Sequence, residues 1–540
     1  MGLILIRSVI IDGRVDATVL FRTVSDHGFS RAFWNSITLG LLVVAGATAL
    51  ALPLAVITTR TSLRYKRWID VVLVIPFLTP PYINALGWML FMEPRGYLVH
   101  LAPRAGDWSA AFFSLPGMVM VMSLHLYPFL YLMLRNTLAQ LSGSLDEAAA
   151  VSGARPVYRF VTVTLRLLVS GYAMGSLLVF VKTLSEFGTP ITMGRRIGFP
   201  VLVTEIFRYT SSWPLDFGRG SRYAVLLLVL CLGAWAGQNV VSRRNAFHVV
   251  GGKGSRPSGR LTIAGSVVGW VYLSLLLTVS IGIPYFSITL TSLLRLRSSG
   301  IAWGNLTLAH YRAVLEPAGL GLQSLRWSLV LSLAAATVSA VLGTFVALGV
   351  QAARRTGHGS TKTAAALGSA SDALALLPNT VPSIIVVLGL ILMWNAAWMP
   401  VRVYNTPMML VVTYVVLFLP FTVQYVKSSY EAVHPSLRAA GRVCGGSSIY
   451  VFLRVTLPLI APGIVAGWIM TFAISFRELV GSLIVRPPSV HTSATFIYGQ
   501  FEQGSVSQGM AMAVVSVGVT TAILLVARRF DGRRGGVSQR

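Results

Sequence analysis

Long runs of apolar residues, each ended by a short polar segment, recur along the whole chain. An apolar helix needs about 20 residues to cross about 30 Å of hydrocarbon. Eleven runs reach that length, and we predict that each one forms a membrane helix. They lie at about 34–58, 68–92, 114–137, 158–184, 223–243, 262–292, 326–351, 368–395, 405–430, 452–480 and 508–527. The pattern therefore predicts an all-α, polytopic integral membrane protein.

The composition agrees with a membrane protein and excludes other classes. Hydrophobic residues make up 54% of the chain and charged residues 11%, whereas a soluble domain has about 25% charged residues. The apolar content is also too high for a disordered or collagen-like chain. The two cysteines lie in different surroundings, Cys231 in an apolar run and Cys444 in a polar loop. A structural disulfide between them is therefore not expected.

Basic residues outnumber acidic ones by 44 to 17, which gives a formal net charge of +27. In a soluble protein this excess would suggest binding to nucleic acid. Here most basic residues fall in short segments on one side of the membrane, as the positive-inside bias of cytoplasmic loops predicts. The segment 185–222 is an exception, because its five arginines lie on the opposite side. We expect membrane lipid, and no nucleic acid, around this chain.

The two halves of the sequence resemble each other. Residues 145–154 match residues 437–446 at an offset of 292, and the register holds as far as Glu186 and Glu478. Spacing is kept within the predicted helices, while the loops absorb the differences in length, as in a duplicated helical unit. Both copies of the 145–154 segment fall on the cytoplasmic side, so the repeat is parallel. Parallel halves are compatible with a two-fold axis along the membrane normal and a path between the halves.

The repeat divides the chain into three parts. The predicted first half spans residues 1–241 and contains the cytoplasmic segment 145–156. A polar stretch rich in Gly, Ser and Arg, residues 242–261, is the predicted cytoplasmic linker. The predicted second half spans residues 262–540 and contains the segment 437–448.

The halves are unequal, with five predicted helices in the first and six in the second. The helix at 262–292 has no counterpart, because the matching stretch would precede Met1. Residues 3–10 are similar to the end of such a helix. Two interpretations are open: the true start lies upstream, or the first half works with five helices.

Both halves contain a pair of prolines in or near the second predicted core helix. The pairs Pro76 with Pro80 and Pro378 with Pro382 are related by an offset of 302. Proline removes a backbone hydrogen bond, so we expect kinks at these positions. Such interruptions line a cavity in some transporters; the alternative is plain kinks that allow helix packing. Asn84 either faces the path or makes an interhelical hydrogen bond.

The segment 145–156 and the VTL tripeptide that follows it resemble the EAA loop of ATP-binding-cassette (ABC) importer permeases. The second copy, residues 437–448, continues into VTLPL, which is closer to the usual ending in that family. Residues 183–190 and 475–479 are similar to the ferric-iron branch, in which two permease halves are fused. The resemblance covers nearly the whole chain.

The resemblance implies a permease without its own motor. In such importers each EAA segment forms a coupling helix that docks on a cytoplasmic ABC ATPase dimer. The sequence has no G-x-x-x-x-G-K-[ST] phosphate loop, so ATP is expected on the partner and no cofactor on this chain. The external loops are short, so a separate periplasmic or lipid-anchored solute-binding protein is expected. The expected location is the bacterial inner membrane.

The residues expected to couple the permease to the ATPase come from both EAA-like segments. They are Glu147, Ala148, Ala149, Gly153, Ala439, Ala440, Gly441 and Gly445. Glu147 has two compatible interpretations, a pairing with a base on the ATPase and a capping box with Ser144. Ala439 has neither the charge nor the box, so the two ATPase contacts are expected to differ. Gly153 and Gly445 are expected to allow a tight turn.

Glu186 and Glu478 occupy equivalent positions in a chain that is poor in acidic residues. Ionisable groups inside a membrane helix are costly and are candidates for function. In one interpretation the two carboxylates lie near the pathway or its external gate. In the other they lie close to the membrane interface, neutralised by the neighbouring bases Lys182 and Arg477.

The sequence contains no arrangement that indicates enzyme chemistry. The eight histidines form no cluster with metal-ligand spacing, and no nucleophile–base pattern is present. No catalytic or metal-binding residue is therefore expected.

The preferred interpretation is the fused permease subunit of a binding-protein-dependent ABC importer, with ferric iron as the expected solute. Iron rests on the resemblance alone. Thiamine, phosphonates, polyamines and other small solutes are alternatives. A proton- or sodium-coupled secondary transporter is the alternative mechanism, and a membrane-embedded enzyme is the third class.

Overall fold

The structure, a computed structural model, describes residues 2–11, 14–16, 18–60, 79–140, 149, 151–244, 263–356 and 381–535. These residues are almost all helical. The strands β1 (Ile10–Ile11) and β2 (Arg14–Val15) form one short antiparallel pair. The all-α class predicted from the sequence is confirmed.

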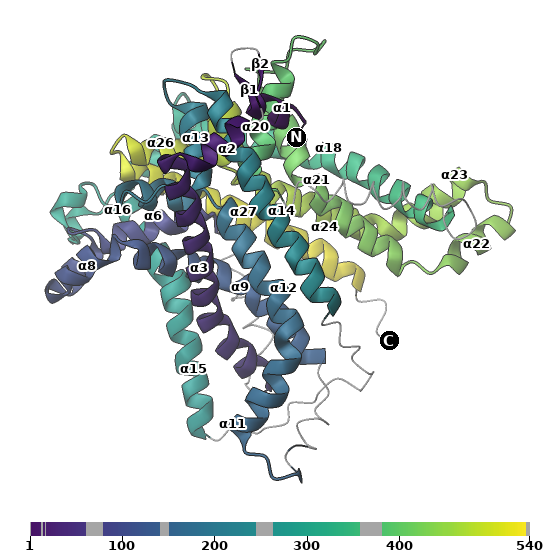
Figure 1. Ribbon diagram of the computed structural model, residues 1–540, viewed down its shortest axis with the longest axis horizontal. Helices are drawn as coiled ribbons and strands as arrows, with labels where there is room; N and C mark the ends of the chain where they lie inside the picture. Colours follow the sequence, from purple (N-terminus) through teal and green to yellow (C-terminus); the bar gives the residue numbers. More distant parts are fainter. Residues whose placement is uncertain are drawn as a thin grey trace. The chain divides into compact units, whose positions relative to one another are not determined.

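The chain divides into two compact units. The N-terminal unit comprises residues 2–290 and 296–305, and the C-terminal unit comprises residues 291–295 and 306–540. In the N-terminal unit, Figure 1 shows α3, α9 and α12 side by side.

The N-terminal unit contains most of the elements. They are α1 (Gly2–Val9), α2 (Thr18–Ser25), α3 (His27–Arg60), α6 (Pro81–Met92), α7 (Tyr97–Leu101), η1 (Pro103–Ala105), α8 (Gly106–Phe112), α9 (Leu115–Gln140), α11 (Pro156–Arg159), η2 (Phe160–Thr164), α12 (Leu165–Ser185), η3 (Pro190–Gly194), α13 (Leu202–Ser211), α14 (Phe217–Arg244), α15 (Ile263–Leu277), η4 (Thr278–Gly282), α16 (Ile283–Leu293), η5 (Arg297–Ser299) and η6 (Trp303–Asn305). The last turn of α16 belongs to the C-terminal unit.

The C-terminal unit contains the second set. Its elements are α17 (Ala309–Leu315), α18 (Leu320–Thr356), α20 (Ser383–Trp394), α21 (Pro407–Ala432), α22 (Pro435–Val443), α23 (Ser448–Val451), η7 (Phe452–Thr456), α24 (Leu457–Phe476), α25 (Val480–Val485), α26 (Ser493–Glu502) and α27 (Val506–Gly535). The segments η2, η3, η4 and η7 are π-helical, and the other η segments are 3-10 helices.

Nine helices in the described part of the chain are long and apolar enough to cross a membrane. They match nine of the eleven predicted runs. The other two runs, 68–92 and 368–395, contain the apolar helices α6 and α20, each of 12 residues. Residues 68–78 and 368–380 lie outside the described residues. The polytopic membrane class is confirmed.

The sequence repeat returns as a repeat of helices. The helices α9 and α21 begin 292 residues apart, and so do η2 and η7, and also α12 and α24. The short helices α6 and α20 begin 302 residues apart. The segments between the repeated helices therefore absorb the change in length; between α6 and α9 the longer segment contains the short helices α7, η1 and α8.

Small residues bring the same pair of helices together in both units. An added Cβ on Gly175 of α12 would lie 2.6 Å from Leu130 of α9. At the equivalent position, an added Cβ on Gly467 of α24 would lie 2.9 Å from the Cα atom of Thr422 in α21. Glycines four residues apart let membrane helices approach closely, and Gly463 precedes Gly467 by that spacing. Backbone contact at this spacing fixes the separation of the two helices.

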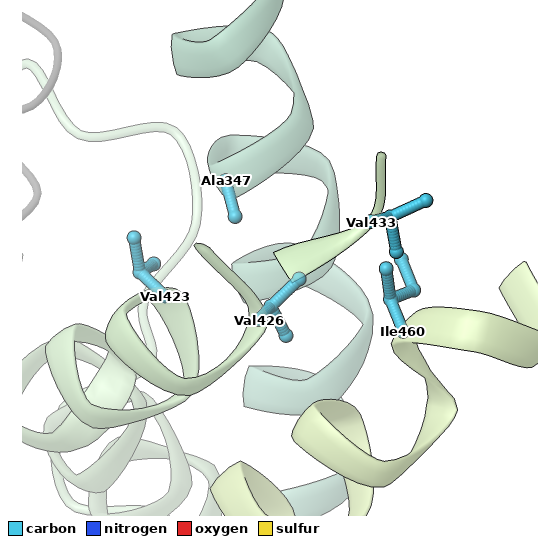
Figure 2. Packing of buried hydrophobic residues seen from close by; sticks show 5 residues of the cluster. All are labelled: Ala347, Val423, Val426, Val433 and Ile460. Atoms are coloured by element: carbon cyan, nitrogen blue, oxygen red, sulfur yellow. The ribbon is translucent and has the colours of Figure 1, made fainter. Parts of the chain in front are cut away.

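Apolar side chains pack α18, α21 and α24 together at one end of the C-terminal unit. Figure 2 shows Ala347, Val423, Val426, Val433 and Ile460 pointing toward one another, all of them buried. Val433 follows the last residue of α21, so the core holds the end of that helix in place.

The helix pair α15–α16 packs within the N-terminal unit. The Tyr272 hydroxyl donates to the Leu50 carbonyl oxygen over 2.8 Å, and the Tyr285 hydroxyl lies 2.8 Å from Thr79 Oγ1. Pro284 lies where a side chain on Gly87 would be. The boundary between the halves of the repeat, at 262, stays a prediction. In the structure, the pair α15–α16 packs against helices that precede this boundary.

We predict that Gly467→Leu destabilises the C-terminal unit by about 1–3 kcal/mol, because the new side chain meets the backbone of α21. The measurement is the thermal unfolding midpoint of the purified protein in detergent. Gly518→Leu in α27 is the matched control, because nothing lies within 4 Å of its added Cβ. An equal loss in both variants would contradict the close-packing argument.

Candidate functional site

The second EAA-like segment forms the helix α22, which follows α21 after a link of two residues, Val433 and His434. His434 caps the helix by accepting a hydrogen bond from the Ser436 amide over 3.3 Å. Pro435 occupies the first helical position, where its missing N–H costs nothing. This capping compensates for the absence of a capping box in this copy. The link sets α22 directly against the end of a membrane helix.

The glycine turn within each EAA-like segment has the same geometry in both copies. Gly153 has φ +79° and Gly445 has φ +83°, a conformation that residues with a Cβ rarely adopt. The Ala154 amide donates to the Ala149 carbonyl oxygen over 3.0 Å, and Gly446 donates to Gly441 over the same distance. These are the tight turns that the sequence predicts. Glu147 and Ala148 lie outside the described residues.

The helix α22 has no buried residue. Ala439 and Ala440 are exposed, and so are two large apolar side chains, Leu437 at 47% and Val443 at 87%. Gly441 instead faces α23, where an added Cβ would lie 3.1 Å from Val451. The helix therefore presents these two apolar side chains at its surface, where a protein partner could cover them.

The two carboxylates Glu186 and Glu478 follow membrane helices and are buried, at 8% and 9% exposure. Glu186 Oε1 accepts from the Thr189 amide over 2.9 Å. Glu478 accepts twice, from Gly481 at Oε1 over 2.9 Å and from Ser482 at Oε2 over 3.1 Å. Each carboxylate therefore satisfies backbone N–H groups at the start of the next helical turn.

Backbone amides hold both carboxylates in the part of the chain that the structure describes. Lys182 forms no ion pair with Glu186 among these residues, although the sequence places the two one helical turn apart. Burial raises the pKa of Glu186 to about 7 and raises the pKa of Glu478 above its ordinary value. Backbone hydrogen bonds oppose this rise in both cases. Whether the two groups serve the pathway stays a prediction.

Three polar contacts near this region were not anticipated from the sequence. The Tyr414 hydroxyl lies 2.7 Å from Ser482 Oγ, beside Glu478. Ser36 Oγ accepts from the Leu202 amide over 2.9 Å, and Ser328 Oγ accepts from the Ser493 amide over 2.7 Å. The serines thus tie the first long helix of each unit to the start of α13 or α26. Their offset of 292 was the only signal.

The remaining candidates lie near the start of α6 and α20. Pro80 and Pro382 are the N-cap residues of these helices, and Asn84 is buried within α6. Pro76 and Pro378 lie outside the described residues. The described prolines therefore stand where a helix begins, a position that proline tolerates. A role of Asn84 in the pathway stays a prediction.

Three of the five arginines in the segment 185–222 form an ion pair with an acidic residue. The pairs are Arg196 with Glu93 at 3.7 Å, Arg219 with Asp216 at 3.4 Å, and Arg208 with Glu205. Local pairing reduces the net positive charge of this external segment, which explains how it departs from the charge bias of cytoplasmic loops.

Among the described residues no group of three or more His, Cys, Asp and Glu side chains could hold a metal ion. Cys231 is buried and Cys444 exposed, and both are free thiols.

Comparison with known proteins connects this architecture to a family. The chain is 23% identical over 515 residues to the ferric transport system permease protein FbpB of Actinobacillus pleuropneumoniae, covering 92% of this chain and 70% of the relative. It is 22% identical over 474 residues to the Fe(3+)-transport system permease protein FbpB 2 of Haemophilus influenzae, covering 86% and 83%. It is 28% identical over 165 residues to the molybdenum transport system permease protein ModB of Escherichia coli, covering 29% and 71%.

The family model described as "binding-protein-dependent transport system inner membrane component" matches residues 47–247 and 346–535. The two matches fall one on each half of the repeat and include both EAA-like segments. Together they span more than half of the chain. The chain therefore belongs to the family of inner membrane components of binding-protein-dependent transport systems.

Proposed function

We propose that this chain is the fused permease subunit of an ABC importer for ferric iron. It forms the translocation path and takes its energy from a separate cytoplasmic ATPase dimer. The family is one of transport permeases, which is not an enzyme class. Dependence on a binding protein is part of the family description; that this partner is periplasmic or lipid-anchored is part of the proposal.

The observation that carries the ATPase coupling is the exposed helix α22. In Figure 1 it lies beyond the ends of its neighbours α21 and α24. Its side chains Leu437 and Val443 are exposed. Apolar side chains on a helix end are costly in water, so a protein partner that covers them gains stability. The matching turn at Gly153 supports a second coupling segment in the first half.

The choice of ferric iron rests on two relatives whose names contain ferric or Fe(3+) transport and which match most of this chain. The molybdenum permease matches a shorter part. The membrane path need not bind iron tightly, because selectivity in this proposal lies with the binding protein.

We propose a structural role for Glu186 and Glu478. Each holds the turn after a membrane helix by accepting backbone hydrogen bonds. Burial raises the pKa of Glu186 to about 7, which makes this carboxyl a poorer fixed charge for a cation than an exposed glutamate.

Reconstitution tests the function. We expect vesicles that contain this chain, its ATPase and a ferric-loaded binding protein to accumulate iron only when ATP is supplied. Omitting the ATPase should abolish uptake. A binding protein loaded with molybdate is the control for the solute. Accumulation by this chain alone, driven by an ion gradient without nucleotide, would instead identify a secondary transporter.

The two coupling segments should respond differently to mutation. Glu147→Ala should lower ATP-driven transport about tenfold, because it removes one partner of an interfacial charge pair. Ala439→Glu should have little effect, since that interface already works without a carboxylate. Transport and co-purification of the ATPase are the measurements. Wild-type values in Glu147→Ala would remove the charge pair from the mechanism.

The two buried carboxylates also differ in what glutamine can replace. Glu186→Gln should cost less than Glu478→Gln, because the amide oxygen keeps the bond from Thr189 and the new NH2 group replaces Oε2, which has no hydrogen-bond partner. Glu478→Gln should cost about 1–3 kcal/mol, because one of its two backbone donors loses its acceptor. The unfolding midpoint and iron uptake are measured together. If Glu186→Gln abolishes uptake without changing stability, the charge belongs to the pathway.

A further inference from the structure

Two side chains, Arg438 of α22 and Tyr430 of α21, contact each other across the link between these helices. The guanidinium carbon of Arg438 lies over the Tyr430 ring, 4.4 Å from its centroid. Nη1 of the same guanidinium donates a hydrogen bond to the Tyr430 hydroxyl. Arg438 is half-buried, whereas the residues on either side of it in α22 are exposed. Arg438 thus connects α22 to the membrane helix that precedes it.

The contact removes much of the arginine from water. Nε and Nη2 of Arg438 are buried and have no hydrogen-bond acceptor among the described residues. An arginine covered in this way is stabilised by the face of an aromatic ring, and the attraction grows as water is excluded. Tyr430 therefore supplies the main compensation for burying the charge.

The end of α21, which carries Tyr430, is held by contacts with neighbouring helices. Val433, three residues after Tyr430, is part of the buried cluster with Ile460 and Val426 (Figure 2). The neighbouring Glu431 accepts a hydrogen bond from Gln351 of α18 over 2.7 Å. The end of α21 is thus tied to α18 and α24, and a force applied to Arg438 reaches a packed helix bundle.

The first half of the chain cannot form the same contact. At the offset of 292, Leu138 stands in place of Tyr430 and Asp146 in place of Arg438. A leucine has no ring face, and an aspartate has no cation to place on one. The clamp therefore belongs to the second half alone.

We propose that Arg438 is a positioning residue that clamps α22 to α21 through Tyr430. Movement of the docked ATPase then reaches the membrane helices without relative motion between α22 and α21. This rests on the proposed function, since α22 must be the docking helix. The clamp acts in the second half, where the EAA-like segment lacks the glutamate of the first.

The test separates coupling from docking and from folding. In vesicles with the ATPase and binding protein, Tyr430→Leu and Arg438→Gln should lower the iron transported per ATP by roughly three- to thirtyfold, the range that a partly desolvated cation–π contact can supply. Co-purification of the ATPase should be unchanged. Tyr430→Phe keeps the ring face and should retain most of the wild-type ratio.

Two matched controls accompany these variants. Arg442→Gln removes the same charge from an exposed position of α22, and Tyr425→Leu makes the same exchange elsewhere on α21. Both should keep the wild-type transport per ATP; a change in ATPase binding by Arg442→Gln would be a docking effect.

Three results would overturn the clamp. The first is a wild-type ratio in both Tyr430→Leu and Arg438→Gln, and the second is an equal loss in Tyr430→Phe. The third is the disappearance of both variants from the membrane while Tyr425→Leu is retained, because the contact would then serve folding. If the wild-type chain neither binds an ATPase nor uses ATP, the proposed function fails, and the clamp fails with it.

Discussion

Hydrocarbon offers no hydrogen bonds, so every backbone N–H and C=O group in the membrane must find a partner within the protein. Helices meet this demand along their length, but each helix end leaves groups without partners. In this chain Glu186, Glu478, Ser36 and Ser328 accept hydrogen bonds from amides at such ends. Short helices can therefore follow the long ones without exposing backbone to an apolar surrounding.

Both halves of the repeat carry these hydrogen-bond acceptors at equivalent positions, 292 residues apart. Where helices pack closely, as at Gly175 and Gly467, a change in one residue forces a shift in the partner helix. The segments between the repeated helices carry no such constraint, and the ten-residue difference in offset between α6 and α9 falls in the segment that holds α7, η1 and α8 in the first copy. Close packing of the helices therefore explains why the spacing of residues within the helices is the same in both halves.

The sequence was sufficient for the helices and the repeat, because apolar length and self-similarity are local signals. It failed for the partners of the buried carboxylates. Lys182 and Glu186 are one turn apart on paper, but α12 ends at Ser185 and Glu186 has an extended backbone, with ψ 128°. The packing of α15 was equally hidden, since lipid and a neighbouring helix select the same apolar side chains. The ring beneath Arg438 lies eight residues away, and no helical spacing pairs them across the break at Val433.

The fusion of the two halves into one chain explains why the two EAA-like segments can differ in sequence. Two separate, identical permease subunits would have to present the same surface to both ATPase contacts. In one polypeptide each copy occupies a fixed place, so the sequences can diverge, with Asp146 and Glu147 in one EAA-like segment and Arg438 and Ala439 in the other. Under the proposed function, a copy that lacks the carboxylate can compensate if its helix does not move relative to α21, because less of the applied displacement is then lost. The helix α22 is restrained in this way by its two-residue link, its cap at His434 and the stacked Arg438.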